Sequence, residues 1–250
     1  MDLGIDGRVA LVMGASRGLG KGIAGALARE GAKVAIASRS RERLDATAEE
    51  LGRSVTAFVA DAGDLDRLAE LPAEVEAELG PIDILVANTG GPPPGFALDN
   101  TIGEWEEAYR SLVLGLRVLV GAVLPGMRER GWGRIVNVGS NSTVEPIPSI
   151  AISNSVRLAA VGLLKTLSRE VAADGITVNT VVTGKFATDR LAENEGSLEQ
   201  AEANARGAVP AGRLGLPEEF GDLVAFLASD RAAYVNGTTI PIDGGFLRSV

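Results

Sequence analysis

Residues 13–32 read MGASRGLGKGIAGALAREGA, a glycine-rich stretch that joins a β-branched run at residues 8–13 to the start of a helical pattern. Gly14 permits a tight turn, while Gly18 and Gly20 let the backbone approach a pyrophosphate at a helix N-terminus. Glycine also serves plain packing, but the order strand, turn, helix in a βαβ unit favours dinucleotide binding. We therefore expect the loop to contact a cofactor through Gly14, Ser16, Arg17, Gly18, Leu19 and Gly20.

The rest of the chain keeps the same alternation of strand and helix. Short, mostly apolar strands are predicted at residues 8–13, 33–37, 54–59, 82–88, 134–139, 176–182 and 238–242. Helical patterns are predicted at residues 19–30, 41–52, 65–79, 101–130, 152–173 and 217–229. This alternation is typical of an α/β fold with a parallel, doubly wound sheet covered by helices on both faces. No repeat or linker divides the chain, so we expect a single domain over residues 1–250.

The composition excludes several classes of function. The 250 residues include 33 acidic and 24 basic side chains, giving a net charge of −9, and neither Cys nor His is present. Such a chain has no Ser-His-Asp triad, no thiolate nucleophile, no disulfide and no zinc site of the usual kinds, so we expect no metal. Its acidity argues against nucleic-acid binding, which needs a basic face.

The sequence carries no obvious targeting signal. The first residues, MDLGIDGR, lack the apolar run of a signal peptide. The most apolar stretch, Leu112–Val123, is interrupted by Arg117 and is too short to span a bilayer. We therefore expect a cytoplasmic protein that acts on a small-molecule substrate, without a membrane or nucleic-acid partner.

Two irregular segments interrupt the alternation of strands and helices. GGPPPG at residues 90–95 is a stiff loop directly after the fourth strand, and residues 189–208 are rich in Glu, Asn and Ala. In sheets of this kind, ligands bind outside the carboxyl ends of the strands, where both segments fall. We expect residues 189–208 to form a mobile helical insertion that shapes the substrate pocket together with the loop.

The end of the second strand indicates which cofactor is used. NAD-preferring folds place a carboxylate near this point to bind the ribose 2′-hydroxyl. Here the chain has Ser38 and Arg39, with Arg17 available from the glycine turn. A hydroxyl and guanidinium groups match a 2′-phosphate. Arg39 and Arg41 also fit the start of a solvated helix, but the missing acid favours NADP(H).

Motifs spread over the whole chain resemble those of the short-chain dehydrogenase/reductase superfamily. Besides the glycine turn they are Asp61 after the third strand, ANTG (87–90), GRIVNVGS (133–140), GITVNTVVTG (175–184) and the segment 213–245. Within that superfamily the sequence is most similar to 3-oxoacyl-acyl-carrier-protein reductases. The resemblance implies a single-domain Rossmann fold with seven strands, and a homo-oligomer, either a tetramer or a dimer.

The resemblance also implies cofactor contacts, carried over by position. Asp61 and Ala62 would meet the adenine. Asn88 and Gly90 would line the adenosine ribose. The nicotinamide would be bordered by Gly184, Phe186 and Thr188.

The family's catalytic tetrad of Asn, Ser, Tyr and Lys is altered in this chain. Its serine corresponds to Ser140, after the fifth strand. Alignment on GLLKTLSREVAADGITVN puts Ser153 at the tyrosine position and Arg157 at the lysine position. The asparagine position falls on Leu112. The resemblance therefore implies a short-chain dehydrogenase/reductase without the catalytic Tyr and Lys, in which Arg157 contacts the cofactor.

These replacements remove the usual proton donor for carbonyl reduction. Loss of a matched general acid typically costs ~10²–10⁴ in rate. Tyr109 and Tyr234, the two tyrosines of the chain, do not fill the position by local realignment. Arg157 lies four residues after Ser153, so both can face the cofactor from one side of a helix. Its pKa is too high for an acid at neutral pH, although it can stabilise negative charge, and serine can relay a proton from water.

Other side chains are candidates for the missing role. Glu145 could act as a buried carboxylic acid, and Lys185 as a poorly solvated ammonium, although both also fit ordinary solvated loop charges. Asn141 and Asn154 are candidates for substrate hydrogen bonds or for structural ones.

Two interpretations of function remain open from the sequence. The first is an NADP(H)-dependent oxidoreductase that passes hydride between nicotinamide and a carbonyl or alcohol, or to a conjugated or imine acceptor, with a non-standard proton donor. The second is a catalytically silent NADP(H)-binding sensor or regulatory subunit. The polar groups at Ser153 and Arg157 favour the enzyme, whereas Leu112 favours the silent subunit. A purely structural partner would leave the glycine turn and Arg39 unexplained.

Overall fold

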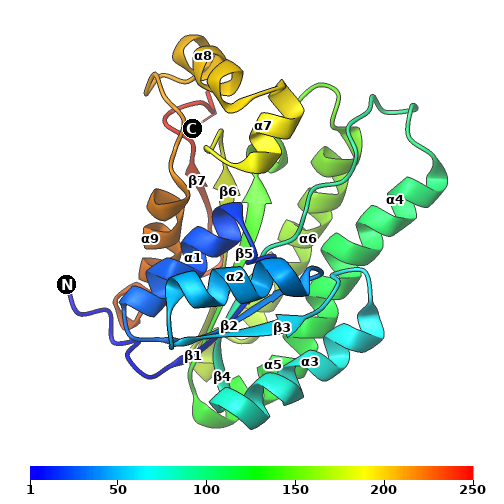
Figure 1. Cartoon of the computed structure of the whole chain (residues 1–250). Coiled ribbons are helices and arrows are strands. Elements are labelled where there is room, and N and C mark those ends of the chain that lie inside the picture. The colour runs from blue at the N-terminus through cyan, green and yellow to red at the C-terminus, as the bar shows by residue number, and fades with distance from the viewer. Residues whose placement is uncertain (250) are drawn as a thin grey trace.

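Seven parallel strands form the central sheet of the computed structural model, which describes residues 1–249 (Figure 1). The strands are β1 (Val9–Met13), β2 (Lys33–Ser38), β3 (Val55–Val59), β4 (Ile82–Ala87), β5 (Gly133–Ser140), β6 (Ile176–Thr183) and β7 (Thr239–Ile242). Their order is β3-β2-β1-β4-β5-β6-β7, and all neighbours pair in parallel. The predicted doubly wound, seven-stranded sheet is confirmed. The strand order reverses between β1 and β4, where such sheets bind ligands.

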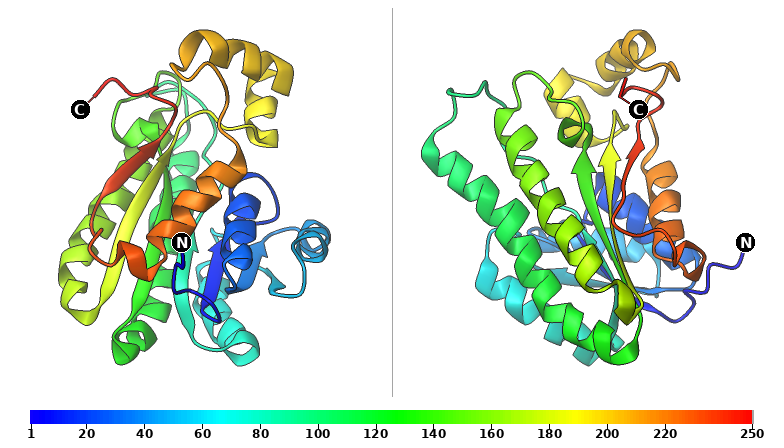
Figure 2. Two further views of the ribbon diagram at one scale, coloured as in Figure 1. Left: turned by 90° about the vertical axis from the view of Figure 1, so that its left-hand side faces the viewer. Right: turned by 180° about the vertical axis from the view of Figure 1, so that it is seen from behind.

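Helices cover both faces of this sheet (Figure 2). The main helices are α1 (Gly18–Arg29), α2 (Arg41–Leu51), α3 (Leu65–Leu79), α4 (Ile102–Tyr109), α5 (Gly115–Arg130), α6 (Ala151–Glu170), α7 (Asp189–Glu195), α8 (Leu198–Ala208) and α9 (Pro217–Leu227). Leu11 and Met13 of β1 pack on the side of α3, α5 and α6, whereas Ala10 and Val12 pack on the side of α1 and α9. Successive side chains of a strand alternate between its faces, so nearly all-apolar strands are buried on both sides.

Short polar side chains cap several of the helices. Ser40 Oγ accepts a hydrogen bond from the Arg43 N–H over 3.3 Å at the start of α2. Thr101 and Glu104 form a reciprocal capping box at the start of α4. Because the first N–H groups of a helix have no intrahelical acceptor, these side chains determine where each helix begins.

The helix predicted at residues 101–130 is continuous but contains a π-helical turn. This turn, η1 (Arg110–Leu114), joins α4 to α5. Among the described residues 1–249, the run Ile102–Arg130 is the one helix long and apolar enough to cross a membrane. The whole helix is thus longer than the apolar stretch Leu112–Val123 on which the expectation rested. Its buried side chains, which include Leu116, Leu119 and Val123, pack in the core against the sheet, and this packing accounts for their apolar character.

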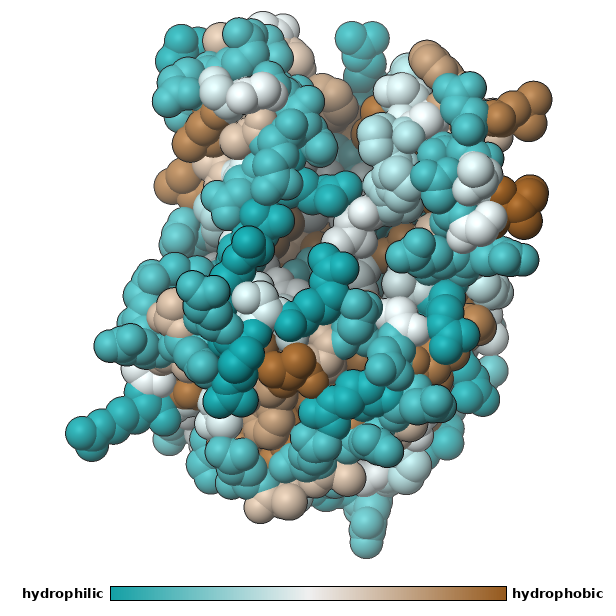
Figure 3. Space-filling model, turned by 45° about the vertical axis from the view of Figure 1, so that its right-hand side comes forward, coloured by the Kyte–Doolittle hydropathy of each residue, from teal (hydrophilic) through white to brown (hydrophobic). Residues whose placement is uncertain are grey.

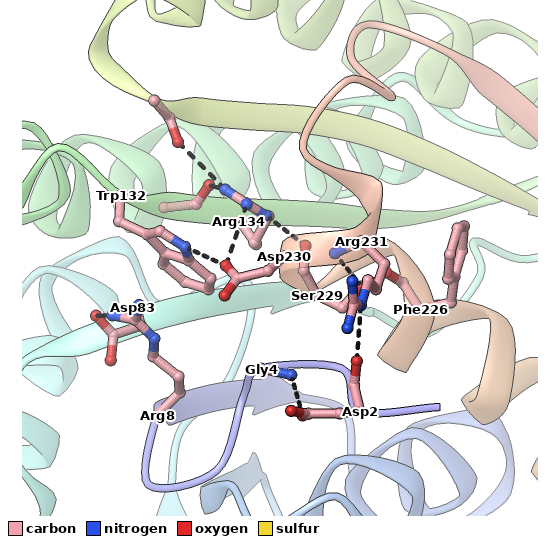
Figure 4. A network of polar contacts seen from close by, with 12 residues as sticks. Asp2, Gly4, Arg8, Asp83, Trp132, Arg134, Phe226, Ser229, Asp230 and Arg231 are labelled. Carbon is pink, nitrogen blue, oxygen red and sulfur yellow. Dashed lines mark hydrogen bonds and ion pairs between the residues drawn. The ribbon is translucent and has the colours of Figure 1, made fainter.

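A polar network lies at the amino ends of the strands (Figure 4). Arg134 at the start of β5 is 2% exposed, and its guanidinium lies 4.3 Å from the centre of the Trp132 ring. Arg8 approaches that ring to 3.9 Å, and Trp132 Nε1 donates to Asp230 Oδ1 over 2.8 Å. Burial lowers the pKa of Arg134, although the charge of Asp230 opposes that shift. The network fastens β5 to the turn before β7, at the end of the sheet opposite Ser140.

The segment 189–208 contains two helices, α7 and α8. Both lie beyond the carboxyl ends of the strands (Figures 1 and 2). Ala201 and Ala205 of α8 form a small apolar cluster of their own with Val209 and Leu214. The helical content agrees with the expectation, and the mobility of this segment stays a prediction.

Candidate active site

The glycine turn joins β1 to α1 in a conformation that requires glycine. Gly14 and Gly18 have φ angles of 59° and 56°, in the left-handed region that favours glycine. A Cβ atom on Gly20 would lie 2.2 Å from the Gly14 carbonyl oxygen. The first N–H groups of α1 have no intrahelical acceptor, so the turn presents donors to an anion.

Side chains from two other elements fix this turn. Asn88 Nδ2 donates to the carbonyl oxygens of Met13 and Gly14, each over 3.2 Å. Thr47 of α2 donates from its hydroxyl to the Ser16 carbonyl over 3.1 Å. Asn88 was expected at the adenosine ribose. In the structure its amide nitrogen holds the turn, and its contact with the ribose stays a prediction.

The end of β2 offers polar groups where a 2′-phosphate is expected. Ser38 Oγ is buried and has no hydrogen-bond partner among residues 1–249. The Arg39 side chain is 81% exposed, with Nε 3.9 Å from Asp61 Oδ2. Arg17 behaves differently from our expectation, because it forms ion pairs with Asp189 and Glu193 of α7. Arg39, and not Arg17, is therefore the guanidinium available beside Ser38.

These features fit NADP(H). The glycine turn leaves room and N–H donors for a pyrophosphate. The unpartnered hydroxyl of Ser38 and the exposed guanidinium of Arg39 suit a phosphorylated ribose.

The other expected cofactor residues lie around the same edge of the sheet. Gly184 directly follows β6, and a Cβ there would lie 2.6 Å from Asp243 Cα. Phe186 is buried edge-on against Phe220, with ring centroids 5.3 Å apart, so its side chain faces the core. Thr188 caps α7 by accepting from the Leu191 N–H over 3.3 Å.

Two of the expected cofactor residues, Thr188 and Ala62, lie against neighbouring elements. Thr188 Cγ2 would lie 3.4 Å from a Cβ on Gly18, so α7 begins against the glycine turn. The carbonyl oxygen of Ala62 would lie 2.5 Å from a Cβ on Gly115, which places the end of β3 against α5. Nothing in the described chain lies within 4 Å of a Cβ on Gly90, so that position is open.

Ser140, Ser153 and Arg157 lie on β5 and α6, and a hydrogen bond joins these two elements. Ser140 Oγ, at the end of β5, accepts from the Ser142 N–H over 3.2 Å. Ser153 is 8% exposed in the first turn of α6, and Arg157 follows one turn later. Arg157 Nη1 donates to the carbonyl oxygen of Val138 on β5 over 3.1 Å. The contact brings the guanidinium against the last residues of β5, beside Ser140.

The electrostatic surroundings of Arg157 are unusual. Burial, and secondarily the positive charge of Arg190, lower the pKa of Arg157 to about 10. The group therefore remains a cation at neutral pH. It can stabilise negative charge on a substrate oxygen, as expected, but it does not replace the tyrosine as an acid.

Leu112 and the two tyrosines lie in apolar or exposed surroundings. Leu112 is buried within η1 and packs in the core with Met13 and Leu68. Tyr109 is 46% exposed on α4 and lines an apolar surface groove between α4 and α6. Tyr234 is fully exposed shortly after the turn that holds Asp230. Both phenols lie at the surface.

The geometry does not support Glu145 or Lys185 as the replacement proton donor. Glu145 Oε1 accepts from the backbone N–H groups of Arg248 and Ser249, over 3.0 and 2.7 Å. Lys185 Nζ forms a 2.6 Å ion pair with Glu195. Burial alone would raise the pKa of Glu195, but hydrogen bonds, chiefly that from Lys185, lower it overall. Both candidates are engaged in structural contacts.

The two candidate asparagines also have structural partners. The Asn154 side chain accepts from the Ile147 N–H and donates to its carbonyl, over 3.3 and 2.9 Å. Asn141 Nδ2 donates to Asp243 over 2.9 Å, whereas its buried Oδ1 has no partner within residues 1–249. Asp243 was not singled out from the sequence. Its only signal there is its place in the closing IDGG.

The loop 90–95 lies against the start of α6. The Gly95 N–H donates to the Ser149 carbonyl over 2.7 Å, and the Ala151 N–H donates back to the Gly95 carbonyl over 3.1 Å. Ser149 has φ 60°, the one non-glycine residue of the described chain in the left-handed region. Such strain often accompanies functional sites. The space-filling view shows a largely polar face whose upper end is hollowed between two raised parts (Figure 3).

A dinucleotide-binding Rossmann fold with a polar group at the end of β5 is the arrangement expected of a nicotinamide-dependent oxidoreductase. Comparison with known proteins agrees. Residues 14–247 match the model of the enoyl-(acyl carrier protein) reductase family. The 3-oxoacyl-acyl-carrier-protein reductase of Vibrio cholerae is 37% identical over 244 residues, which are 97% of this chain and 98% of that protein.

Solved structures give the same result. L-sorbose reductase from Gluconobacter frateurii, complexed with NADPH and L-sorbose, has a TM-score of 0.95 and 30% identity, with all of both chains covered. A 3-oxoacyl (acyl-carrier-protein) reductase from Agrobacterium tumefaciens C58 with NADP bound has a TM-score of 0.92 and 29% identity, covering 98% of this chain and 96% of that one. The chain belongs to the short-chain dehydrogenase/reductase superfamily, and the relatives named here are oxidoreductases.

Proposed function

We propose that the protein is an NADP(H)-dependent oxidoreductase, similar to 3-oxoacyl reductases, with an active site that lacks the usual tyrosine and lysine. It passes hydride between nicotinamide and a carbonyl or alcohol, or to a conjugated or imine acceptor. The observation that carries this proposal is the hydrogen bond from Arg157 to Val138. It holds a cation beside Ser140, at the edge of the sheet where the cofactor residues gather.

The cofactor would be held by the glycine turn at its pyrophosphate and by Ser38 and Arg39 at its 2′-phosphate. When bound, NADPH supplies the hydride. Asp61 and Ala62 remain the proposed adenine contacts, and Gly184 and Thr188 the proposed nicotinamide neighbours. The NADPH and NADP complexes of the two solved relatives support this assignment.

The residues of β5 and α6 would orient the substrate and stabilise charge. The hydroxyls of Ser140 and Ser153 offer hydrogen bonds to a substrate oxygen. The Arg157 guanidinium would stabilise the negative charge that develops on that oxygen. The proton would come from water through a serine hydroxyl, because serine itself is a poor acid. Acceptors that need little acid assistance would react fastest.

Single-turnover oxidation of NADPH, with enzyme in excess of cofactor, tests the proposal. The panel contains acetoacetyl thioesters, diketones, quinones, cyclic imines and small oxo acids, and cofactor fluorescence reports binding. We expect binding of NADPH and oxidation with at least one acceptor. Binding without oxidation across the panel would contradict the proposal and favour a silent NADP(H)-binding subunit. Absence of binding would contradict the cofactor assignment as well.

Three features expected from the sequence remain parts of this proposal. The helices of residues 189–208 would move to admit substrate. The protein would act in the cytoplasm and would assemble as a homo-oligomer. Mass photometry would measure the assembly, and hydrogen exchange with and without NADPH would measure the mobility of α7 and α8.

A further inference from the structure

The short helix α7 carries several charges, and its acids are already paired. Asp189 Oδ2 and Glu193 Oε1 lie 3.4 and 3.0 Å from Arg17 Nη1. Glu195 is paired with Lys185 at 2.6 Å. In the structure, the α7 carboxylates are neutralised by cations from other elements.

Arg190, the one cation of α7, has no such partner. Its Nη2 donates to the carbonyl oxygens of Gly91 and Pro92, over 3.2 and 3.4 Å. Over residues 1–249 no carboxylate lies within 4.0 Å of its guanidinium. The contacts hold the cation against the loop 90–95 without cancelling its charge.

Arg157 also has no ion-pair partner among residues 1–249. Its guanidinium is half-buried and donates to a carbonyl oxygen on β5, with no carboxylate in ion-pair range. The loop that Arg190 contacts pairs with the backbone on either side of Ile150, at the start of the helix that carries Arg157. After burial, the positive charge of Arg190 is the second cause of the lowered pKa of Arg157. The loop 90–95 therefore connects the helix that carries Arg190 to the start of the helix that carries Ser153 and Arg157.

The phosphates of the cofactor are expected elsewhere. The pyrophosphate belongs at the glycine turn after β1, and the 2′-phosphate at Ser38 and Arg39 after β2. Arg157 and Arg190 lie instead around the ends of β5 and β6, on the substrate side. Arg157 is partly buried, and a partly buried cation without a counter-ion is costly unless a bound anion offsets that cost; Arg190 is exposed and can reach an anion from the solvent side.

We propose that Arg190, together with Arg157, binds a carboxylate of the substrate. This inference rests on the proposed function and narrows it: the preferred substrates are small oxo acids or unsaturated acids, and not neutral ketones or esters. The planar guanidinium suits bidentate pairing with a carboxylate. Arg157 would then contact both the carboxylate and the reacting oxygen.

Three matched pairs of probes test the proposal: pyruvate, acetoacetate and levulinate, each with its methyl ester. In these acids the carboxyl carbon lies one, two and three bonds, respectively, from the ketone carbon. Calorimetry on the enzyme–NADP⁺ complex measures binding without turnover, and NADPH oxidation measures turnover separately. The variants are Arg190→Ala, Arg190→Lys and, as a matched control, Arg206→Ala on the exposed face of α8.

We expect at least one acid to bind about tenfold more tightly than its ester, as for hydrogen bonds to charged groups. Arg190→Ala should remove that preference and leave the affinities for the ester and for NADPH unchanged. Arg190→Lys should keep part of the preference for the acid over its ester, and Arg206→Ala should keep all of that preference.

Equal binding of every acid and its ester would overturn the proposal. So would an Arg190→Ala variant that loses NADPH affinity as much as acid affinity, because the cation would then serve the cofactor. The enzyme could also prefer the acids in binding while no acceptor oxidises NADPH. That result would contradict the proposed function but would still support the carboxylate site.

Discussion

The Nη1 atom of Arg157 donates a hydrogen bond to the carbonyl oxygen of Val138 over 3.1 Å. Val138 lies two residues before Ser140 on β5, and Arg157 lies one turn after Ser153 on α6. One contact thus joins the elements that carry the candidate catalytic groups. Because a carbonyl oxygen is neutral, it orients the guanidinium and leaves its charge available.

Replacement of Arg157 by alanine should weaken both cofactor binding and turnover. Removal of a charge-stabilising donor costs about 10²-fold or more in kcat, and the loss of the expected contact between Arg157 and the cofactor should raise the dissociation constant of NADPH. Arg157→Lys, which keeps the cation, should recover part of both. Steady-state kinetics and fluorescence titration measure the two effects. Unchanged kinetics in Arg157→Ala would remove Arg157 from the site.

The variant Ser140→Ala should lower kcat without changing NADPH affinity. The substitution removes a hydroxyl at the end of β5 and the acceptor for the Ser142 N–H. We expect a loss of about 10²-fold in kcat, in the range of a lost proton-transfer group. The control is Ser155→Ala on α6, because Ser155 is exposed and bonds only to the carbonyl one turn before it. Equal losses in the two variants would contradict a role for Ser140 in the reaction.

Asp230 should matter for stability and not for catalysis. Asp230→Ala removes the acceptor for Trp132 Nε1 and the carboxylate 3.9 Å from buried Arg134. We expect the free energy of unfolding to fall by about 1–3 kcal/mol, measured by urea denaturation. NADPH affinity should not change, because the network lies at the far end of the sheet. Asp222→Ala, which breaks an exposed pair with Arg29, should cost less than about 0.5 kcal/mol.

Glu219 should contribute a pH-dependent part of the stability. The hydrogen bond from Arg213, followed by that from the Leu216 N–H, lowers the pKa of Glu219 from 4.5 to about 2. A carboxyl whose pKa is lower in the folded state stabilises the fold above pH 4.5, and the contribution disappears as the pH falls toward 2. Because the pair is partly exposed, the effect is about 1 kcal/mol or less.

Urea denaturation of Glu219→Gln between pH 7 and pH 3 checks this contribution. We expect the wild-type protein to be more stable at pH 7, with the difference shrinking below pH 4.5. Glu218→Gln, at a neighbouring residue on α9, is the control for the loss of one negative charge from this helix. A gap between wild type and Glu219→Gln that stays constant down to pH 3 would contradict the assigned pKa.

Much of the fold was predictable because its signals are local. The strand predicted at residues 134–139 is β5 (Gly133–Ser140), and that predicted at 82–88 is β4 (Ile82–Ala87). Alternation of side chains and helix capping act over a few neighbouring residues, so the pattern is visible without the fold. The glycine turn was predictable for the same reason: Gly14 has the positive φ that its sequence context demanded.

The side-chain partners around the site depend on long-range packing. Arg17 pairs with Asp189, 172 residues away, and Glu145 holds the backbone of Arg248, 103 residues away. No local pattern links such residues, because the contact exists only once the segments above the sheet are packed together. The chain thus encodes a Rossmann fold and its cofactor turn in short patterns. Tertiary packing decides which charged side chains remain without an ion-pair partner, because two groups distant in sequence form a pair only when folding brings them together.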